Sequence, residues 1–216
     1  METAFGKRLD RVRQASPLVH CISNLVTAND CANVVLAAGA SPIMADAPEE
    51  VREITALSRA LCLSLGTPNP RKADAMFLAG RKAAELGLPV VFDPVGVGAS
   101  AYRQEIARKL LQDIPLTVLR CNASELQTLS GQSLVSRGVD AGKAPELETL
   151  LLLAGRFAAA HHCIVAVTGA EDIVTDGTTA YGIRSGTPLL RQVTGTGCML
   201  SVLTAAFVGA NPEAPL

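Results

Sequence analysis

Residues 89–99 read PVVFDPVGVGA, an apolar run that ends in Asp93 and leads into a glycine-containing turn. Similar short β-rich runs recur along the chain, and helical patterns lie between them. These runs cover residues 18–23, 41–44, 60–65, 116–120 and 163–168. Strands that alternate with helices are typical of a parallel sheet with helices on both faces. The sequence therefore predicts an α/β fold with three layers, α/β/α.

Several segments between the runs carry helix patterns. Residues 101–111 and 147–157 place apolar side chains three and four positions apart, which is the spacing of a one-sided helix. Residues 1–14 are predicted to form an amphipathic first helix. Asp46 is predicted to cap a helix whose first turn contains Pro48, because proline costs no hydrogen bond at that position.

The pattern changes after residue 168. Residues 173–174 and 179–183 indicate a β-hairpin that turns at Asp176 and Gly177. We therefore expect the parallel sheet to continue into an antiparallel edge. Residues 131–145 are polar and contain glycine, so they are predicted to form a surface connection.

Composition limits the class of protein. The chain of 216 residues is 49% hydrophobic and 18% charged, so we expect one domain over residues 1–216, and leave open whether it is truncated at its carboxyl end. With 19 basic and 20 acidic residues, the net charge of -1 creates no broad field toward nucleic acid or anionic lipid. Aromatic residues make up only 3%, which removes the stacking platforms of single-strand binders. We expect neither nucleic acid nor a membrane as partner.

Cysteine usage indicates the compartment. The six cysteines form no CxxC pair, and several lie in apolar runs, which suits reduced thiols better than disulfides or zinc ligands. The amino-terminal residues show no apolar stretch of a signal peptide. A cytoplasmic location is predicted.

Residues 193–198 read VTGTGC and precede an apolar helix predicted at 199–210, after a strand predicted at 189–193. Gly195 and Gly197 would let successive main-chain N–H groups point into one concavity, where free amides and the helix dipole favour an anion. Tight strand-to-helix turns also require glycine, so both interpretations stay open. Cys198 would lie in the first turn, where the dipole should lower the thiol pKa and let it serve as a base. A small packing residue is the alternative.

Other polar residues follow the predicted strands. Asp93 suits a magnesium or phosphate role, or a turn cap, at the carboxyl edge where open α/β sheets bind ligands. Arg120 suits a phosphate contact, Asn122 a helix cap, and Glu125 a capping box or a magnesium-bound water. Because the carboxyl ends of parallel strands share one edge, we expect these residues to converge there with Thr168 and the 193–198 turn.

Two further residues belong to the same predicted edge. Asn24 follows the strand at 18–23, and Met44 ends the strand at 41–44. A polar cap and a core methionine are the alternatives for this pair.

With these residues in place, the chain resembles the hydroxyethylthiazole kinase family of thiamine salvage, within the ribokinase-like superfamily. Several matching stretches in the right order are far more specific than any one of them. They are residues 20–24 with 27, 29 and 33; 41–42 and 44–45; 93–99; 122 with 124–125; 167–169; and 193–198.

The resemblance implies a ribokinase-like fold and ATP-dependent phosphorylation of 4-methyl-5-(2-hydroxyethyl)thiazole at its primary alcohol, with Mg²⁺ and as a homotrimer. Its implied site residues are Met44, Asn24 and Gly195 for substrate; Arg120, Thr168 and Asn122 for ATP; Asp93 and Glu125 for the metal; and Cys198, Gly195 and Gly197 for catalysis. Two alternatives stay open, namely an ATP-dependent dehydratase of the same superfamily and an inactive homologue that binds thiazole or nucleotide.

Overall fold

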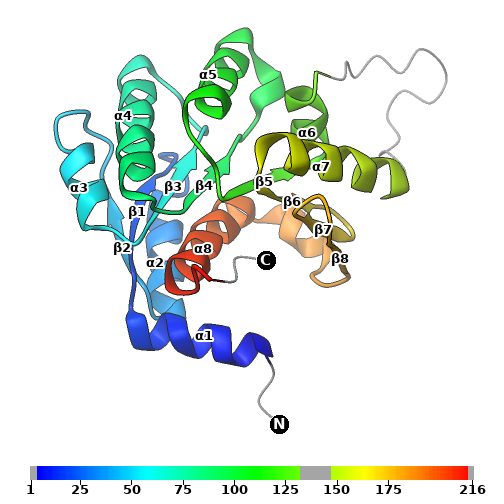
Figure 1. Ribbon diagram of the computed structural model, residues 1–216, viewed down its shortest axis with the longest axis horizontal. Coiled ribbons are helices and arrows are strands. Elements are labelled where there is room, and N and C mark those ends of the chain that lie inside the picture. Colours follow the sequence, from blue (N-terminus) through cyan, green and yellow to red (C-terminus); the bar gives the residue numbers. More distant parts are fainter. Residues whose placement is uncertain (1–3, 132–146, 214–216) are drawn as a thin grey trace.

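The computed structural model describes residues 4–131 and 147–213. Its centre is an eight-stranded sheet in the order β2-β1-β3-β4-β5-β6-β7-β8 (Figure 1). The strands are β1 Leu18–Ile22, β2 Ser41–Met44, β3 Ala60–Ser64, β4 Val90–Asp93, β5 Val118–Asn122, β6 Ile164–Thr168, β7 Asp172–Thr175 and β8 Ala180–Ile183. Strands β1 to β6 pair in parallel, and β7 and β8 pair antiparallel at one edge. The predicted change to antiparallel pairing is confirmed.

Helices cover both faces of this sheet. They are α1 Ala4–Ala15, α2 Ala28–Ala38, α3 Val51–Leu57, α4 Pro70–Leu86, α5 Ala101–Asp113, α6 Ala123–Leu129, α7 Leu147–His161 and α8 Thr196–Ala210, with short 3₁₀ turns η1 Val97–Ala99 and η2 Pro188–Gln192. One apolar core joins α3 to α7 to one face, and a second joins α1, α2 and α8 to the other. The three-layer α/β/α prediction is confirmed.

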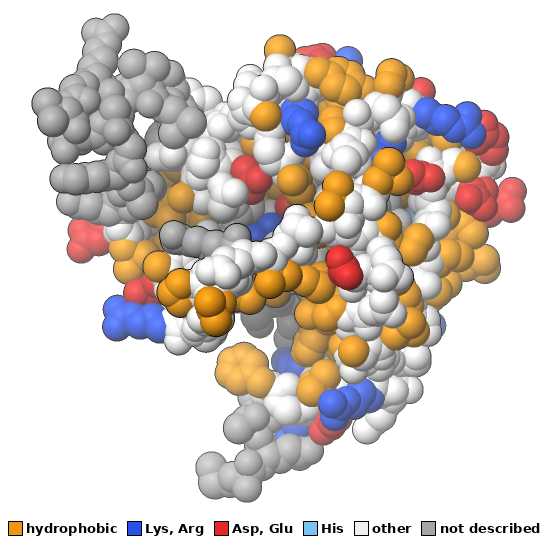
Figure 2. Space-filling view, turned by 180° about the vertical axis from the view of Figure 1, so that it is seen from behind, with side chains coloured by type: hydrophobic (Ala, Val, Ile, Leu, Met, Phe, Trp, Pro, Cys, Tyr) orange, Lys and Arg blue, Asp and Glu red, His pale blue; other side chains and the backbone are white. Residues whose placement is uncertain are grey.

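The central strands explain why the sheet could be found in the sequence. Every residue of β3 and β4 is buried, as expected for parallel strands with helices on both faces. On the face shown in Figure 2, Lys and Arg side chains lie interspersed with Asp and Glu, in keeping with the balanced charge. Among the described residues, no helix is long and apolar enough to span a membrane.

Three local predictions were wrong. The residue at the N-cap of α3 is Glu50 and not Asp46, because residues 48–50 form a turn before the helix starts. Residues 189–193 are not a strand: Pro188 and the Thr187 cap start η2 instead, and Leu189 stays exposed. Strand β5 lies two residues later than the predicted 116–120, because its pairing with β4 and β6 fixes the register. The surface connection predicted at 131–145 lies, after Gly131, outside the described residues.

Candidate functional site

The carboxyl ends of β1, β4, β5 and β6 meet the start of α8 at one edge of the sheet, as predicted. We call this group the rim cluster; its members are Asn24, Asp93, Arg120, Thr168, Cys198 and Ser201. Side-chain hydrogen bonds connect Asn24 to Cys198, and Arg120 and Ser201 to Asp93. Residues up to 177 positions apart in the sequence therefore share one site.

The start of α8 requires glycine for two reasons. Gly195 has a left-handed φ of 82°, which disfavours a side chain, and a Cβ atom there would lie 2.3 Å from Cγ2 of Thr27. A Cβ atom at Gly197 would lie 2.6 Å from Nη1 of Arg120. Both interpretations of the glycines therefore hold together, because the turn is tight and other groups approach it closely.

The main-chain amides at this helix start are available to a ligand. The first turn closes with Met199 N donating to Gly195 O at 2.8 Å. Among the described residues, the amides of Thr196, Gly197 and Cys198 donate to no protein acceptor. Gly195 and the three residues that follow it are buried or half-buried. No described side chain caps this helix start with a hydrogen bond. Free amides and the helix dipole favour an anion here.

Arg120 brings a positive charge next to these amides. Its Nη1 donates to Oδ1 of Asp93 at 3.3 Å, and its Nη2 donates to Oγ1 of Thr168 at 2.7 Å. The remaining Nε is buried and has no protein partner. A guanidinium that is fixed on both sides can present its charge at a defined place.

Asp93 is fully buried below the start of α8. Its Oδ2 accepts a hydrogen bond from Oγ of Ser201 at 2.9 Å. Burial raises the pKa of Asp93, and the charge of Arg120 opposes that rise. Ser201 was missed in the sequence, because a serine within an apolar helix carries no signal until its neighbour is known.

Cys198 does not have the lowered pKa that its place in the helix predicted. Burial and, to a smaller extent, the negative charge of Asp93 raise the pKa of its thiol to about 11. Desolvation outweighs the helix dipole at this buried position, so the thiol is protonated at neutral pH. Its sulfur accepts a hydrogen bond from Nδ2 of Asn24 at 3.1 Å.

Asn122 and Glu125 form the predicted capping box at the start of α6. Oδ1 of Asn122 accepts from the Glu125 amide, and Oε2 of Glu125 accepts from the Asn122 amide, both at 2.9 Å. The second oxygen of Glu125 accepts from the amide of Gly96 at 2.9 Å. Burial raises the pKa of Glu125, while these backbone hydrogen bonds lower it. The carboxylate therefore joins the ends of β4 and β5.

Met44 lies on the same edge but further out. It ends strand β2, pairs with Cys21 of β1, and is 38% exposed. The hydrogen-bonded rim cluster begins one strand further in, at Asn24.

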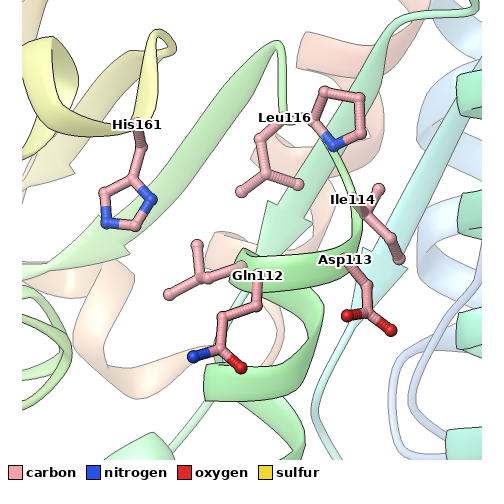
Figure 3. Close-up of a pocket in the computed structure, with 7 residues that line it drawn as sticks. Gln112, Asp113, Ile114, Leu116 and His161 are labelled. Carbon is pink, nitrogen blue, oxygen red and sulfur yellow. The ribbon is translucent and has the colours of Figure 1, made fainter.

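A surface hollow lies at the opposite edge of the sheet. Figure 3 shows Gln112, Asp113, Ile114 and Leu116 around it, with His161 from the end of α7. Residues 112–116 precede β5 and His161 precedes β6, whereas the rim cluster lies at and after the ends of the strands. The hollow is therefore separate from the candidate site.

Comparison with known proteins gives a consistent result. A sequence model described as the hydroxyethylthiazole kinase family matches residues 9–216. The hydroxyethylthiazole kinase of Clostridium acetobutylicum is 45% identical over 215 residues, which cover 97% of this chain and 79% of that protein. The solved structure of the hydroxyethylthiazole kinase protein from Pyrococcus horikoshii OT3 is 39% identical, with a TM-score of 0.85 over 94% of this chain and 75% of that one.

More distant structures share the fold alone. A ribokinase-like superfamily protein of Enterococcus faecalis V583 is 10% identical and has a TM-score of 0.55, over 95% of this chain and 68% of that one. The ribokinase-like fold prediction is confirmed.

Proposed function

Because the chain belongs to the hydroxyethylthiazole kinase family, we propose that it transfers the γ-phosphoryl group of ATP to the primary alcohol of 4-methyl-5-(2-hydroxyethyl)thiazole. The observation that supports this most directly is the row of free amides at the start of α8, beside the Arg120 guanidinium. Phosphoryl transfer is accelerated mainly by positioning and by stabilising charge on the transferred group. Fixed amides and a fixed cation can do both.

The alcohol would bind between β1, β2 and the start of α8. We assign its contacts to Met44, Asn24 and the backbone of Gly195. The partly exposed Met44 supplies an apolar surface for a thiazole ring, and Asn24 is held in place by the hydrogen bond that its Oδ1 accepts from the Thr27 amide.

ATP would bind toward β5 and β6. We assign Arg120 and Thr168 to its phosphates, since only two of the five N–H groups of the Arg120 guanidinium have protein partners among the described residues. Asn122 is exposed at the start of α6 and would lie beside the nucleotide. The amides of residues 195–198, including Gly197, would hold the transferred group, which places the catalytic residues in the same turn.

For magnesium, the donors fit an ion that is held mainly by phosphates and water. Each oxygen of Asp93 and of Glu125 accepts one hydrogen bond, so both carboxylates keep unused lone pairs, but Asp93 is fully buried and Glu125 is 9% exposed. No group of three or more His, Cys, Asp or Glu side chains converges within the described residues. Magnesium often keeps several waters and uses one or two carboxylates. We therefore propose that Glu125 accepts from a metal-bound water and that Asp93 fixes Arg120. The ion neutralises phosphate charge when bound.

Cys198 would contact the reacting alcohol. With a thiol pKa of about 11 it is a poor base at neutral pH, but a loose transition state needs proton removal only late. We propose that the thiol orients the hydroxyl group and that proton transfer accompanies or follows phosphoryl transfer.

We also propose a cytoplasmic homotrimer. The six cysteines are free and buried, which suits a reducing compartment. Leu25 and Val26, directly after Asn24, are 79% and 64% exposed, as expected where a second subunit covers the edge of the site. Light scattering on the purified protein gives its mass directly.

Product analysis tests the activity. The protein is incubated with Mg-ATP and hydroxyethylthiazole, and ADP and thiazole phosphate are followed by mass spectrometry, with a sample lacking the alcohol as control. Both products should appear together. Folded protein that yields neither product contradicts the proposal and favours a binding protein, and ADP without thiazole phosphate favours the dehydratase, which the relatives' kinase name does not support.

A further inference from the structure

Three helices that follow strands of the sheet share an unusual feature at their third residue. Helices α4, α5 and α6 are capped by Asn69, Ser100 and Asn122, and each cap accepts a hydrogen bond from the amide three residues later. The residues at this third position are Lys72, Arg103 and Glu125. Each of their side chains reaches back to the backbone at the carboxyl ends of two neighbouring strands.

Lys72 connects the segments that follow β1 and β3. Its Nζ donates to Ser23 O at 2.8 Å and to Gly66 O at 2.7 Å. Only 3% of the residue is exposed. Among the described residues its ammonium forms no ion pair, although the charge of Asp46 opposes the lowering of its pKa by burial. A buried cation without a counter-charge is costly, even where two carbonyl oxygens satisfy its hydrogen bonds.

Arg103 connects the next two segments in the sheet order. Its Nη1 donates to Leu65 O, after β3, at 2.9 Å and to Val95 O, after β4, at 2.6 Å. Glu125 then joins Gly96, after β4, to Asn122, at the end of β5. The three side chains therefore form a continuous series across β1, β3, β4 and β5.

The segment after β3 shows strain that such a series would have to hold. Thr67 has a φ of 46°, a left-handed value that is uncommon for a side chain with a branched Cβ. Its Oγ1 accepts a hydrogen bond from the amide of Leu25, which follows Asn24. A Cβ atom at Gly66 would lie 2.5 Å from Cβ of Asn24. The position of Asn24, and through it that of Cys198, therefore depends on where the Gly66–Thr67 segment is held.

We propose that Lys72 and Arg103 are positioning residues for the phosphoryl transfer, because they lock the segments after β1, β3 and β4 into one rigid rim. Lys72 fixes Asn24 beside the alcohol site. Arg103 fixes Gly96 and, through it, Glu125 on the phosphate side. The inference rests on the proposed kinase activity. It assigns Lys72 to the binding of the alcohol and Arg103 to the binding of ATP.

The charge state of Lys72 supports this role. Burial, as the largest cause, lowers the pKa of its ammonium to about 8. The titratable and charged groups near it come from four other parts of the fold and are Asp46, Cys62, Arg103 and Cys198. The buried ammonium is less stable in the fold than in water, so Lys72 lowers the stability of the protein. Such a residue is expected where function and stability conflict.

The experiment compares Lys72→Met and Arg103→Met with Lys82→Met, which removes a lysine from the outer part of the same helix α4. We expect Lys72→Met to raise KM for the alcohol roughly tenfold, with kcat changed less than threefold, since one charge-assisted hydrogen-bond pair holds the site in shape. Arg103→Met should instead raise KM for ATP by a similar factor. Lys82→Met should behave as the wild type.

Hydrogen exchange gives a second readout that does not need activity. Amides of residues 23–27 and 66–67 should exchange at least tenfold faster in Lys72→Met than in Lys82→Met. Unchanged exchange and unchanged KM in folded Lys72→Met overturn the proposal, and so does an equal effect in Lys82→Met. If the wild type makes no product but Lys72→Met loses this protection, the kinase assignment fails, while the role of Lys72 in holding the segments after β1 and β3 together is supported.

A pH series decides the case in which Lys72→Met does not fold. Wild-type KM for the alcohol should then rise at least threefold between pH 7 and 9.5, because the neutral amine forms weaker hydrogen bonds. A constant KM over that range overturns the proposal.

Discussion

Replacing Gly197 by alanine tests whether the start of α8 and Arg120 act as one anion site. The added Cβ atom would lie 2.6 Å from Nη1 and 2.7 Å from Nη2 of Arg120, whereas ordinary contacts begin at 3.4 Å. The guanidinium must therefore retreat by roughly 0.8 Å. Arg120 is already at 3.3 Å from Asp93, so this retreat breaks their hydrogen bond.

The magnitude follows from these contacts. A hydrogen bond to a charged group contributes about 1.5–3 kcal/mol, and alanine gains about 1 kcal/mol over glycine in a helix. The net loss of stability should therefore be only about 1 kcal/mol. The effect on ATP should be larger than on folding, because the displaced cation no longer meets the phosphates. We expect kcat/KM for ATP to fall about 10- to 100-fold.

Initial rates of ADP release, with ATP varied at saturating alcohol, measure this effect. Gly155→Ala is the matched control, because a Cβ atom at that position in α7 meets nothing within 4 Å. It should keep wild-type kinetics. A folded Gly197→Ala protein whose kcat/KM for ATP stays within twofold of the wild type would refute the reasoning.

Three further outcomes follow from the same site. Cys198→Ala should lower kcat by roughly tenfold if the thiol only orients the hydroxyl group; a loss of roughly 10²-fold or more would indicate that it assists proton removal, and a loss under about threefold would reduce Cys198 to a packing role. Asp93→Asn should lower the free energy of unfolding by about 3 kcal/mol or more in urea titrations, because Arg120 stays buried without its counter-charge, and an unchanged midpoint would contradict this. The pKa of Lys72 is lowered from 10.5 to about 8 by burial, so the unfolded chain binds more protons between these values. Between pH 8 and 10.5 the wild type should therefore gain stability over Lys72→Met, by roughly 3 kcal/mol at most, and parallel stability curves would oppose this.

The sheet could be predicted because its central strands are apolar throughout. Strand β4 is flanked by helices on both faces, so its burial leaves a continuous hydrophobic run in the sequence. The same signal misplaced β5 by two residues, because Leu116 is apolar and buried without being in the strand. It also failed at Leu189 and Leu190, which are exposed in η2. Hydrophobicity alone neither ensures burial nor fixes the strand register, which is set by strand pairing.

The rim cluster could be predicted in part for a similar reason. Asp93 and Arg120 lie on neighbouring strands, so the rule for parallel strand ends brings them together. The contacts of Lys72 and Arg103 with distant backbone carbonyls leave no such trace, although a basic residue in the first turn of a helix opposes the dipole. That opposition was the available signal. The prediction of a lowered pKa for Cys198 was wrong because the burial of its thiol results from the packing of α8 and not from the turn.

Departures from local stability rules collect at one edge of this molecule. Lys72 sets a positive charge at the positive end of α4, Arg120 and Asp93 form a buried ion pair where apolar side chains would pack more cheaply, and Gly197 weakens the start of α8. At the opposite edge, Ile114 and Leu116 are buried apolar residues that follow the ordinary pattern. Local conflicts that persist at a single site are expected where a ligand benefits from them. The fold therefore points to the carboxyl edge as the functional one without help from the relatives.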